Sequence, residues 1–205
     1  MKRNLIFIII MVLIVGSACA DVPYESRRTL HNGYSMSTPV SDKDIILLLS
    51  AAFSMPTGGN QRALDFYVVT DRQKMLEMKG GNPYSQALDS APCVIVIAAD
   101  TEAAWYEELL EMDAGLSAGA ILLEAADLGL TTCVLSIAPQ SERIQSVRSA
   151  LDIPESMLPV MMIAVGYPEA DAISGASTGN WSDEQVHWER NNDIMDTTDC
   201  NIHPH

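Results

Sequence analysis

The feature that most limits the fold of this chain is an uninterrupted apolar run, APCVIVIAAD, from Ala91 to Asp100. The run is rich in β-branched residues and is bounded by a proline and an aspartate, which is typical of a strand. A half-exposed strand would alternate apolar and polar residues, and this one does not. We therefore expect a central strand covered on both faces, in a sheet with layers on either side.

Helix and strand patterns alternate around this run. The segment SDKDIILLLSAAF (41–53) predicts a mostly buried helix, because a serine can cap it and acidic residues occupy its first turn. A second helix (112–128) carries small residues, and Gly115 and Gly119, at about 1 kcal/mol each in a free helix, make sense there only through tight packing. Further strands are expected at 65–70, 131–138 and 160–168, with a short helix at 141–153. This mixture predicts an α/β or α+β layered sandwich.

The first twenty residues have the layout of a secretory signal peptide, with basic residues, an apolar stretch and then small residues. Cleavage after Ala20 and lipid attachment at Cys19 both fit the sequence, and an uncleaved anchor is a third alternative. We expect an exported protein, either periplasmic or a membrane-anchored lipoprotein. Its folded domain would span residues 21–190, followed by a flexible acidic tail at 191–205.

Charge and cysteine spacing exclude some classes of partner. A formal net charge of -15 argues against nucleic acid, because neutralising a phosphate backbone needs clustered Lys and Arg. Cys93 and Cys133 sit inside apolar runs and are expected to be small buried hydrophobes. Cys200 near two histidines is either a metal ligand or a chance cluster at a loose end, and we expect no metal site.

Two short segments are candidates for ligand binding. In SRRTLHNGY, residues Arg27, Arg28, Thr29 and His31 place guanidinium, hydroxyl and imidazole groups within five residues, a set suited to a phosphate. The alternative is an ordinary solvated cationic surface.

The second segment is MPTGGNQRALDFYVV, which begins at Met55. Its glycines allow the backbone to approach a flat ligand, and Asn60 and Gln61 offer the donors and acceptors that suit the edge of a heterocycle. A plain surface turn is the alternative. Nucleophile-elbow, Walker and zinc-protease motifs are absent from the sequence, so any reactive chemistry would belong to a cofactor.

Taken in order, these segments resemble the nitroreductase family of FMN-dependent oxidoreductases over nearly the whole chain, from Arg27 to about Glu189. The motifs that carry the resemblance are RRTLH, PTGGNQRALDFYVV, APCVIVIAAD, LLEAADLGLTTCV, GYP and VHW. The resemblance implies an α+β three-layer sandwich, with a central, mostly antiparallel sheet flanked by helices. It also implies a domain-swapped homodimer with FMN at the interface.

The resemblance also implies roles for individual residues. Those expected at the phosphate end of FMN are Arg27, Arg28, Thr29 and His31; those near the isoalloxazine are Thr57, Gly59, Asn60, Arg62, Leu135 and Ser136. Arg62 stands where the family usually has Gln, and it would reach the polar edge of the ring or its N1 region. His31 and Asn180 stand where relatives carry cations, which weakens the expected hold on the phosphate. No catalytic side chain is implied.

The implied activity is electron transfer from NAD(P)H or another donor, through flavin N5, to a nitroaromatic, quinone or similar acceptor by a ping-pong mechanism. Two other hypotheses remain open: an exported flavin-binding or interaction protein of the same fold without turnover, and an anchored domain whose motifs match by coincidence. Trp105 and Tyr106 fit either a lid over the flavin or a helix packed on the surface.

Overall fold

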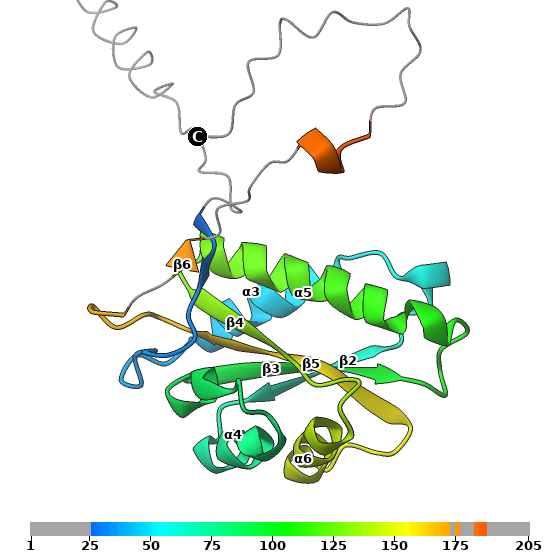
Figure 1. The fold of residues 1–205 in the computed structure, drawn as a ribbon, viewed down its shortest axis with the longest axis horizontal. Helices are drawn as coiled ribbons and strands as arrows, with labels where there is room; N and C mark the ends of the chain where they lie inside the picture. Colours follow the sequence, from blue (N-terminus) through cyan, green and yellow to red (C-terminus); the bar gives the residue numbers. More distant parts are fainter. Residues whose placement is uncertain (1–25, 173–174, 177–182, 188–205) are drawn as a thin grey trace, which may run out of the picture.

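The computed structural model describes residues 26–172, 175–176 and 183–187, with elements labelled as in Figure 1. Within these residues six strands form one mixed sheet in the order β2-β3-β5-β4-β1-β6. Their bounds are Arg28–Thr29 (β1), Leu64–Val69 (β2), Cys93–Asp100 (β3), Thr131–Ser136 (β4), Met157–Gly166 (β5) and Gly175–Ala176 (β6). All neighbouring pairs are antiparallel except β1 and β4. The predicted α+β sandwich with a mostly antiparallel sheet is confirmed.

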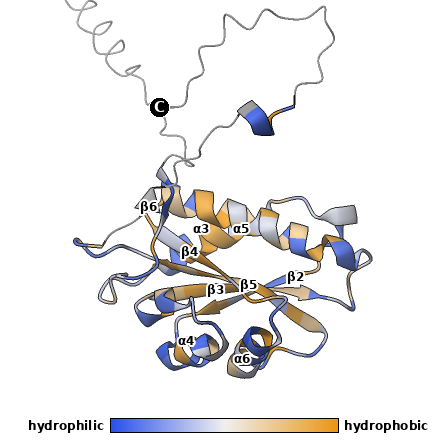
Figure 2. Ribbon diagram, in the orientation of Figure 1, coloured by the Kyte–Doolittle hydropathy of each residue, from blue (hydrophilic) through white to orange (hydrophobic). Residues whose placement is uncertain are grey.

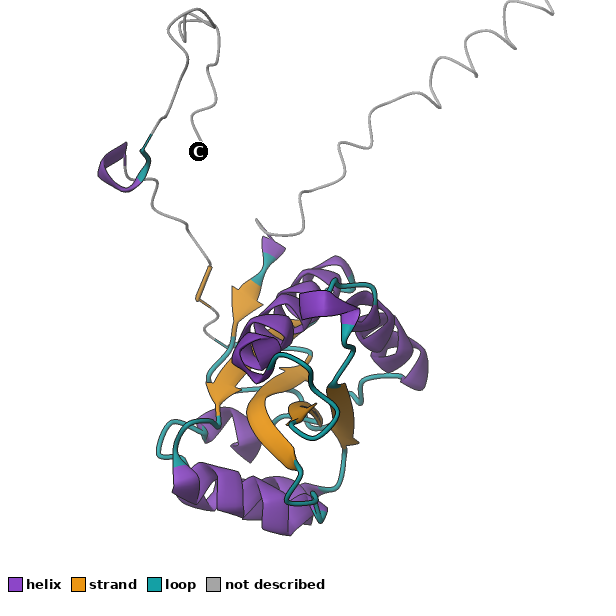
Figure 3. Cartoon of the chain, turned by 90° about the vertical axis from the view of Figure 1, so that its right-hand side faces the viewer, coloured by secondary structure: helices purple, strands orange, loops and turns teal. Residues whose placement is uncertain are grey.

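Strand β3 is the central buried strand that its sequence predicts. Its side chains alternate between two apolar cores, with Ile95 and Ile97 on one face of the sheet and Val94 and Val96 on the other. Helices α3 (Asp42–Phe53) and α5 (Leu110–Asp127) cover the first face, and α4 (Arg72–Met78) and α6 (Ser141–Leu151) cover the second (Figures 1 and 3).

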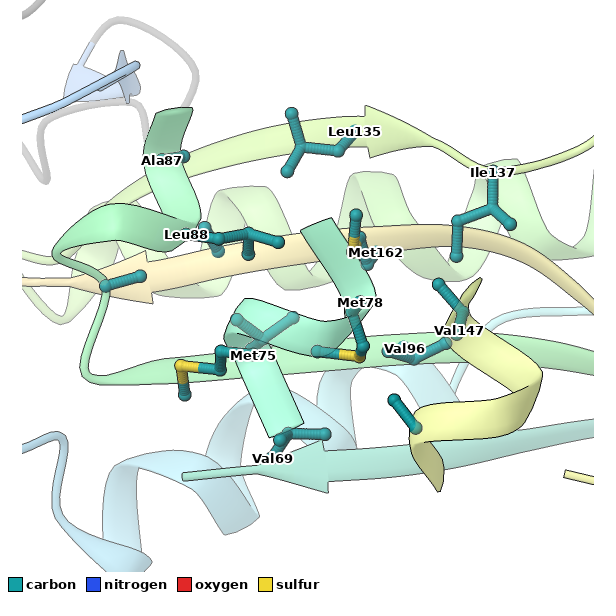
Figure 4. Packing of buried hydrophobic residues seen from close by; sticks show 14 of the residues in the cluster. Val69, Met75, Met78, Ala87, Leu88, Val96, Leu135, Ile137, Val147 and Met162 are labelled. Carbon is teal, nitrogen blue, oxygen red and sulfur yellow. The ribbon is translucent and has the colours of Figure 1, made fainter. Parts of the chain in front are cut away.

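The face under α4 and α6 is closed by close apolar packing. Met75 and Met78 of α4 and Val147 of α6 are fully buried against Val96 and Met162 of the sheet (Figure 4). The sequence patterns did not reveal α4, since seven residues are too few for a helical period to stand out.

The other face confirms both long helices predicted from the sequence. Ser41 caps α3 by accepting a hydrogen bond from the Asp44 backbone N–H at 3.1 Å. Helix α5 turns Ala114, Ala118 and Ile121 to the sheet, where each is nearly or fully buried. Small residues therefore let α5 lie close to the sheet and to α3.

Gly115 and Gly119 correct one expectation. Among the described residues, no atom lies within 4 Å of the position that a Cβ would take at either glycine. The tight packing predicted for these glycines is therefore not found within the described residues, because both face outward from α5. Their helical cost of about 1 kcal/mol each needs another explanation.

Several predictions concern residues outside the described ranges: the signal segment at 1–20, Asn180, and the tail at 191–205 with Cys200. Within the ranges that the structure does describe, no helix combines the length and the apolar character needed to cross a membrane.

Candidate functional site

The loop between α3 and β2 has an unusual backbone. Gly59, Asn60 and Arg62 have φ angles of 58°, 57° and 52°, in the left-handed region that costs a non-glycine residue about 1 kcal/mol. The predicted need for glycine is confirmed at Gly59, where an added Cβ would lie 2.8 Å from the Tyr106 ring. A backbone held in this way is shaped by its surroundings, not by local preference.

A buried aspartate holds the loop in this shape. Asp113, in the first turns of α5, is fully buried and accepts hydrogen bonds from the Gly58 backbone N–H at 2.8 Å and from Gln61 Nε2 at 3.0 Å. The nearby helix N-terminus also favours its negative charge. Sequence reasoning missed Asp113. The available signal was a single carboxylate among small residues of a buried helix, since a buried charge requires partners.

The structure gives Gln61 a different role from the predicted one. Its Oε1 accepts hydrogen bonds from the backbone N–H groups of Trp105 and Tyr106, both at 3.1 Å, while its Nε2 donates to Asp113. The side-chain amide therefore ties three segments of the chain together. Of the predicted amide pair, Asn60 is the one whose side chain remains exposed.

Trp105 and Tyr106 lie in the loop before α5. The interpretation as residues of a packed surface helix is wrong, because residues 101–106 are not helical. Trp105 is 78% exposed, and its backbone is held next to the Gly58–Asn60 turn by Gln61. Its role as a lid stays a prediction.

Arg62 closes the loop and borders a pocket of about 180 Å³. Its backbone N–H donates to Thr57 Oγ1 at 3.1 Å, and its Nε donates to Asn60 Oδ1 at 3.2 Å. Three of the residues predicted to meet the flavin ring, Thr57, Asn60 and Arg62, are thus brought together by direct contacts.

The predicted phosphate group forms a second cluster, at β1. Arg27 Nη1 donates to Thr29 Oγ1 at 3.1 Å, and Thr29 pairs with Thr132 of β4. His31 is exposed, and its Nδ1 lies 3.4 Å from Cys133 Sγ. Burial raises the pKa of the Cys133 thiol, so it stays protonated at neutral pH and is not a nucleophile.

Leu135 and Ser136 lie at the end of β4. The Leu135 side chain is buried in the core beneath α4 and α6, so only its backbone is available to a ligand. Ser136 Oγ accepts a hydrogen bond from Arg143 Nη1 at 2.9 Å. Arg143 is a cation at this strand end that the sequence patterns did not single out.

Comparison with known proteins decides the family. The model of the nitroreductase family matches residues 76–167. A protein of Archaeoglobus fulgidus named "Putative NADH dehydrogenase/NAD(P)H nitroreductase" is 30% identical over 152 residues, which cover 74% of this chain and 87% of that protein. The chain belongs to the nitroreductase family.

Solved structures agree with this assignment. A structure from Clostridium acetobutylicum named "Putative NADH Oxidase" superposes with a TM-score of 0.75 at 30% identity, covering 82% of this chain and 99% of that one. A Desulfovibrio desulfuricans structure, named "a putative nitroreductase in complex with fmn", has a TM-score of 0.67 at 23% identity. The superposition covers 82% of this chain and 95% of the Desulfovibrio chain, and it shows that the two share a fold.

In this nitroreductase-family chain the predicted ring-edge loop and the predicted phosphate cluster lie at opposite ends of α5 (Figure 1). Leu135 and Ser136 belong to neither group, because they lie at the end of β4 away from Thr132, which pairs with Thr29. The loop from Thr57 to Arg62 is tied to Asp113 near the start of α5, whereas β1 pairs with β4, which follows the end of α5 at Asp127. At 1.5 Å per residue, the helix between Asp113 and Asp127 spans about 20 Å. The two groups do not meet within one copy of the described chain.

Proposed function

We propose that this nitroreductase-family protein is an FMN-dependent oxidoreductase. It would pass electrons from NAD(P)H or another donor to a small organic acceptor such as a nitroaromatic compound or a quinone. Family membership supports the class of reaction. The observation that carries the proposal is the loop from Thr57 to Arg62, whose left-handed turn is held by the buried Asp113.

The loop fits the edge of a flavin ring. Arg62 Nε donates a hydrogen bond to Asn60 Oδ1. The Asn60 amide nitrogen has no hydrogen-bonding partner among the described residues, and the side chain is exposed. An N–H donor suits the carbonyl and imine acceptors along an isoalloxazine edge. Gly59 supplies the positive φ of this turn, and its lack of a Cβ leaves room for the Tyr106 ring beside the loop.

The cluster at β1 fits the phosphate of FMN. Arg27, Arg28 and Thr29 supply two guanidiniums and a hydroxyl, which can make charge-assisted hydrogen bonds to a phosphate dianion. His31 adds an imidazole N–H to this cluster. The backbone of Leu135 and Ser136 would lie near the ring, as the family resemblance implies.

We propose that the protein works as a homodimer that joins the two groups. The outer surface of α3 and α5 carries apolar side chains that are 41–61% exposed: Ile46, Met112, Leu116 and Leu123. A groove of about 550 Å³ runs between the two helices beside Gly119. An exposed apolar surface of this kind is typical of a protein interface, and close helix contact across it would explain outward-facing glycines.

A two-fold arrangement of this surface also accounts for the separated groups. If α5 of one copy lies antiparallel to α5 of the other, the start of one helix adjoins the end of its partner. Arg27 and Arg28 of one protomer would then share a flavin with the loop around Asn60 of the other. Each dimer would hold two such sites.

Bound FMN would supply the redox chemistry, because it can take up two electrons from one substrate and deliver them to another. The chain would bind and orient the cofactor and the acceptor, and it would exclude water from the site. Trp105, held in place by Gln61, would cover one side of the acceptor.

We further propose that the protein is exported, with residues 1–20 as the targeting signal. NAD(P)H is scarce outside the cytoplasm, so the electron donor there would be a different reductant or a partner protein.

An absorption spectrum of the purified protein tests the proposal. We expect flavin absorbance that bleaches anaerobically with NADH or dithionite and recovers when a quinone or nitroarene is added. If the protein binds FMN but no pair of electron donor and acceptor supports catalytic turnover, it would instead be a flavin-binding protein without enzymatic activity. Failure to take up added FMN would contradict both.

A further inference from the structure

The pocket beside Arg62 has a composition that flavin binding alone does not require. Its lining residues are Ala52, Phe53, Met55, Thr57, Arg62, Leu64, Phe66 and Ser117. At about 180 Å³ it is smaller than the roughly 300 Å³ at which pockets begin to hold drug-sized ligands. Its size suits a ligand with a single ring.

Two phenylalanines make the pocket suitable for an aromatic ring. Phe53 of α3 and Phe66 of β2 form an edge-to-face pair, with centroids 5.0 Å apart and an interplanar angle of 65°. A third ring placed against them can make further edge or face contacts of the same favourable kind. Phe53 is 60% exposed, so a ligand that covered it would bury apolar surface.

Arg62 adds a positive charge at a fixed position on this apolar pocket. Its left-handed backbone, its N–H bond to Thr57 and its Nε bond to Asn60 restrict where the guanidinium can go. Among the described residues neither Nη atom has a hydrogen-bonding partner, and the ion pairs found there involve Lys79 and Arg148 instead. The Nη groups are therefore free to bind an anion.

We propose that this pocket binds a small aromatic carboxylate, with the ring against Phe53 and Phe66 and the carboxylate on the Nη groups of Arg62. A guanidinium matches a carboxylate through two parallel hydrogen bonds. In a chain of net charge -15, a long-range field repels anions, so a local cation is needed to hold one. The inference rests on the proposed function, for which it adds a carboxylate to the aromatic acceptor that carries the reducible nitro or quinone group, although the binding step itself needs no flavin.

Arg62→Gln tests this assignment with a matched pair of probes. Benzoate and benzamide have the same shape and differ in charge, so the ratio of their dissociation constants isolates the contribution of the cation. We expect the wild-type protein to prefer benzoate by about fivefold to tenfold, as measured by ligand-observed NMR, and Arg62→Gln to lose that preference. Lys43→Gln removes the same charge from an exposed site on α3 and should keep the preference.

The outcomes separate this inference from the flavin proposal. The titrations are run with and without added FMN, and circular dichroism checks that each variant is folded. A benzoate preference that disappears in Arg62→Gln supports the inference, even in a protein that takes up no FMN. An unchanged ratio, or a variant that loses FMN affinity while keeping its benzoate preference, would overturn it and make Arg62 a flavin contact.

Discussion

The helices that cover the two faces of the sheet differ in the polarity of their residues (Figure 2). Over α4 and α6 the outer helix surfaces are mostly polar, as at Lys74, Glu77 and Glu142, and the buried core beneath them is apolar. Over α3 and α5 the outer surface is itself apolar, with Leu116 and Leu123 each 41% exposed beside outward-facing glycines. The outer surface of α4 and α6 is therefore suited to contact with water, whereas the outer surface of α3 and α5 is suited to contact with another protein chain.

The faces also differ in what holds their parts together. Apolar packing dominates the α4 and α6 side, where Arg143 and Arg148 of α6 also donate hydrogen bonds to backbone oxygens of the sheet strands. The α3 and α5 side includes a buried carboxylate, Asp113, that fixes a loop of the candidate site. We therefore expect substitutions under α4 and α6 to lower stability alone, and substitution of Asp113 to impair FMN binding as well.

The largest effect is expected for Met78→Ala on the closed face. Met78 is fully buried, and removing its side chain leaves a cavity, so we expect a loss of about 3 kcal/mol in the free energy of unfolding. Urea denaturation measures this loss. FMN affinity at temperatures where the variant is folded should not change. A large drop in affinity would mean that the two faces are not independent.

Asp113→Ala should cost about 2 kcal/mol and also abolish FMN binding. The change leaves the Gly58 N–H and the Gln61 amide without their acceptor, and it releases the left-handed loop. Glu111→Ala, which removes an exposed carboxylate two residues earlier in the same first turn of α5, is the matched control and should leave both measurements within error. An Asp113→Ala variant that still bound FMN normally would show that the loop does not depend on this carboxylate.

Alkaline pH should weaken the fold through cysteines on both faces. Burial raises the pKa of Cys93 from 9.0 to about 12, so the thiol stays neutral in the folded state while the unfolded chain ionises. Its contribution is complete below pH 9 and is lost as the pH rises toward 12, at about 1.4 kcal/mol per pH unit. Cys93→Ala should flatten this slope when unfolding is followed between pH 8 and 11. An identical slope would assign the loss to other groups, such as Cys133, whose pKa burial also raises.

The smallest change in stability is expected for Gly119→Ala, which should act in opposite directions on folding and on dimerisation. Gly119→Ala should stabilise the isolated chain by up to about 1 kcal/mol, because nothing among the described residues obstructs a Cβ there and alanine favours a helix. The same change should weaken the dimer, because the methyl group would hold the partner helix away. Sedimentation over a range of concentrations separates the two effects. Unchanged or tighter association would place the interface elsewhere.

Much of the fold follows from local pattern. The buried strand around Ile95 and the capped helix at Ser41 were predictable, because apolar runs and capping residues report directly on burial and on helix starts. The two-residue strand β1 was not, since its existence depends on pairing with β4 more than a hundred residues later.

The site was predictable only in part. Glycine in the loop and the amide of Asn60 follow from residue type, and the family resemblance identified the segments. The role of Gln61 did not follow, because it depends on Asp113, a partner 52 residues away that the fold brings within 3.0 Å. Nor could the sequence show that Gly115 and Gly119 face outward, since helical periodicity does not say which small residues meet the sheet.

The central claim is that one flavin site draws on two copies of the chain, and mixing two defective variants tests it most directly. Arg28→Gln disables the phosphate group, and Asn60→Gly removes the amide while keeping a residue that accepts a positive φ. Each variant alone should bind FMN weakly. After co-refolding in equal amounts, heterodimers should contain one intact site, so about a quarter of all sites should recover wild-type affinity. If each site lies within one copy, the mixture would recover nothing.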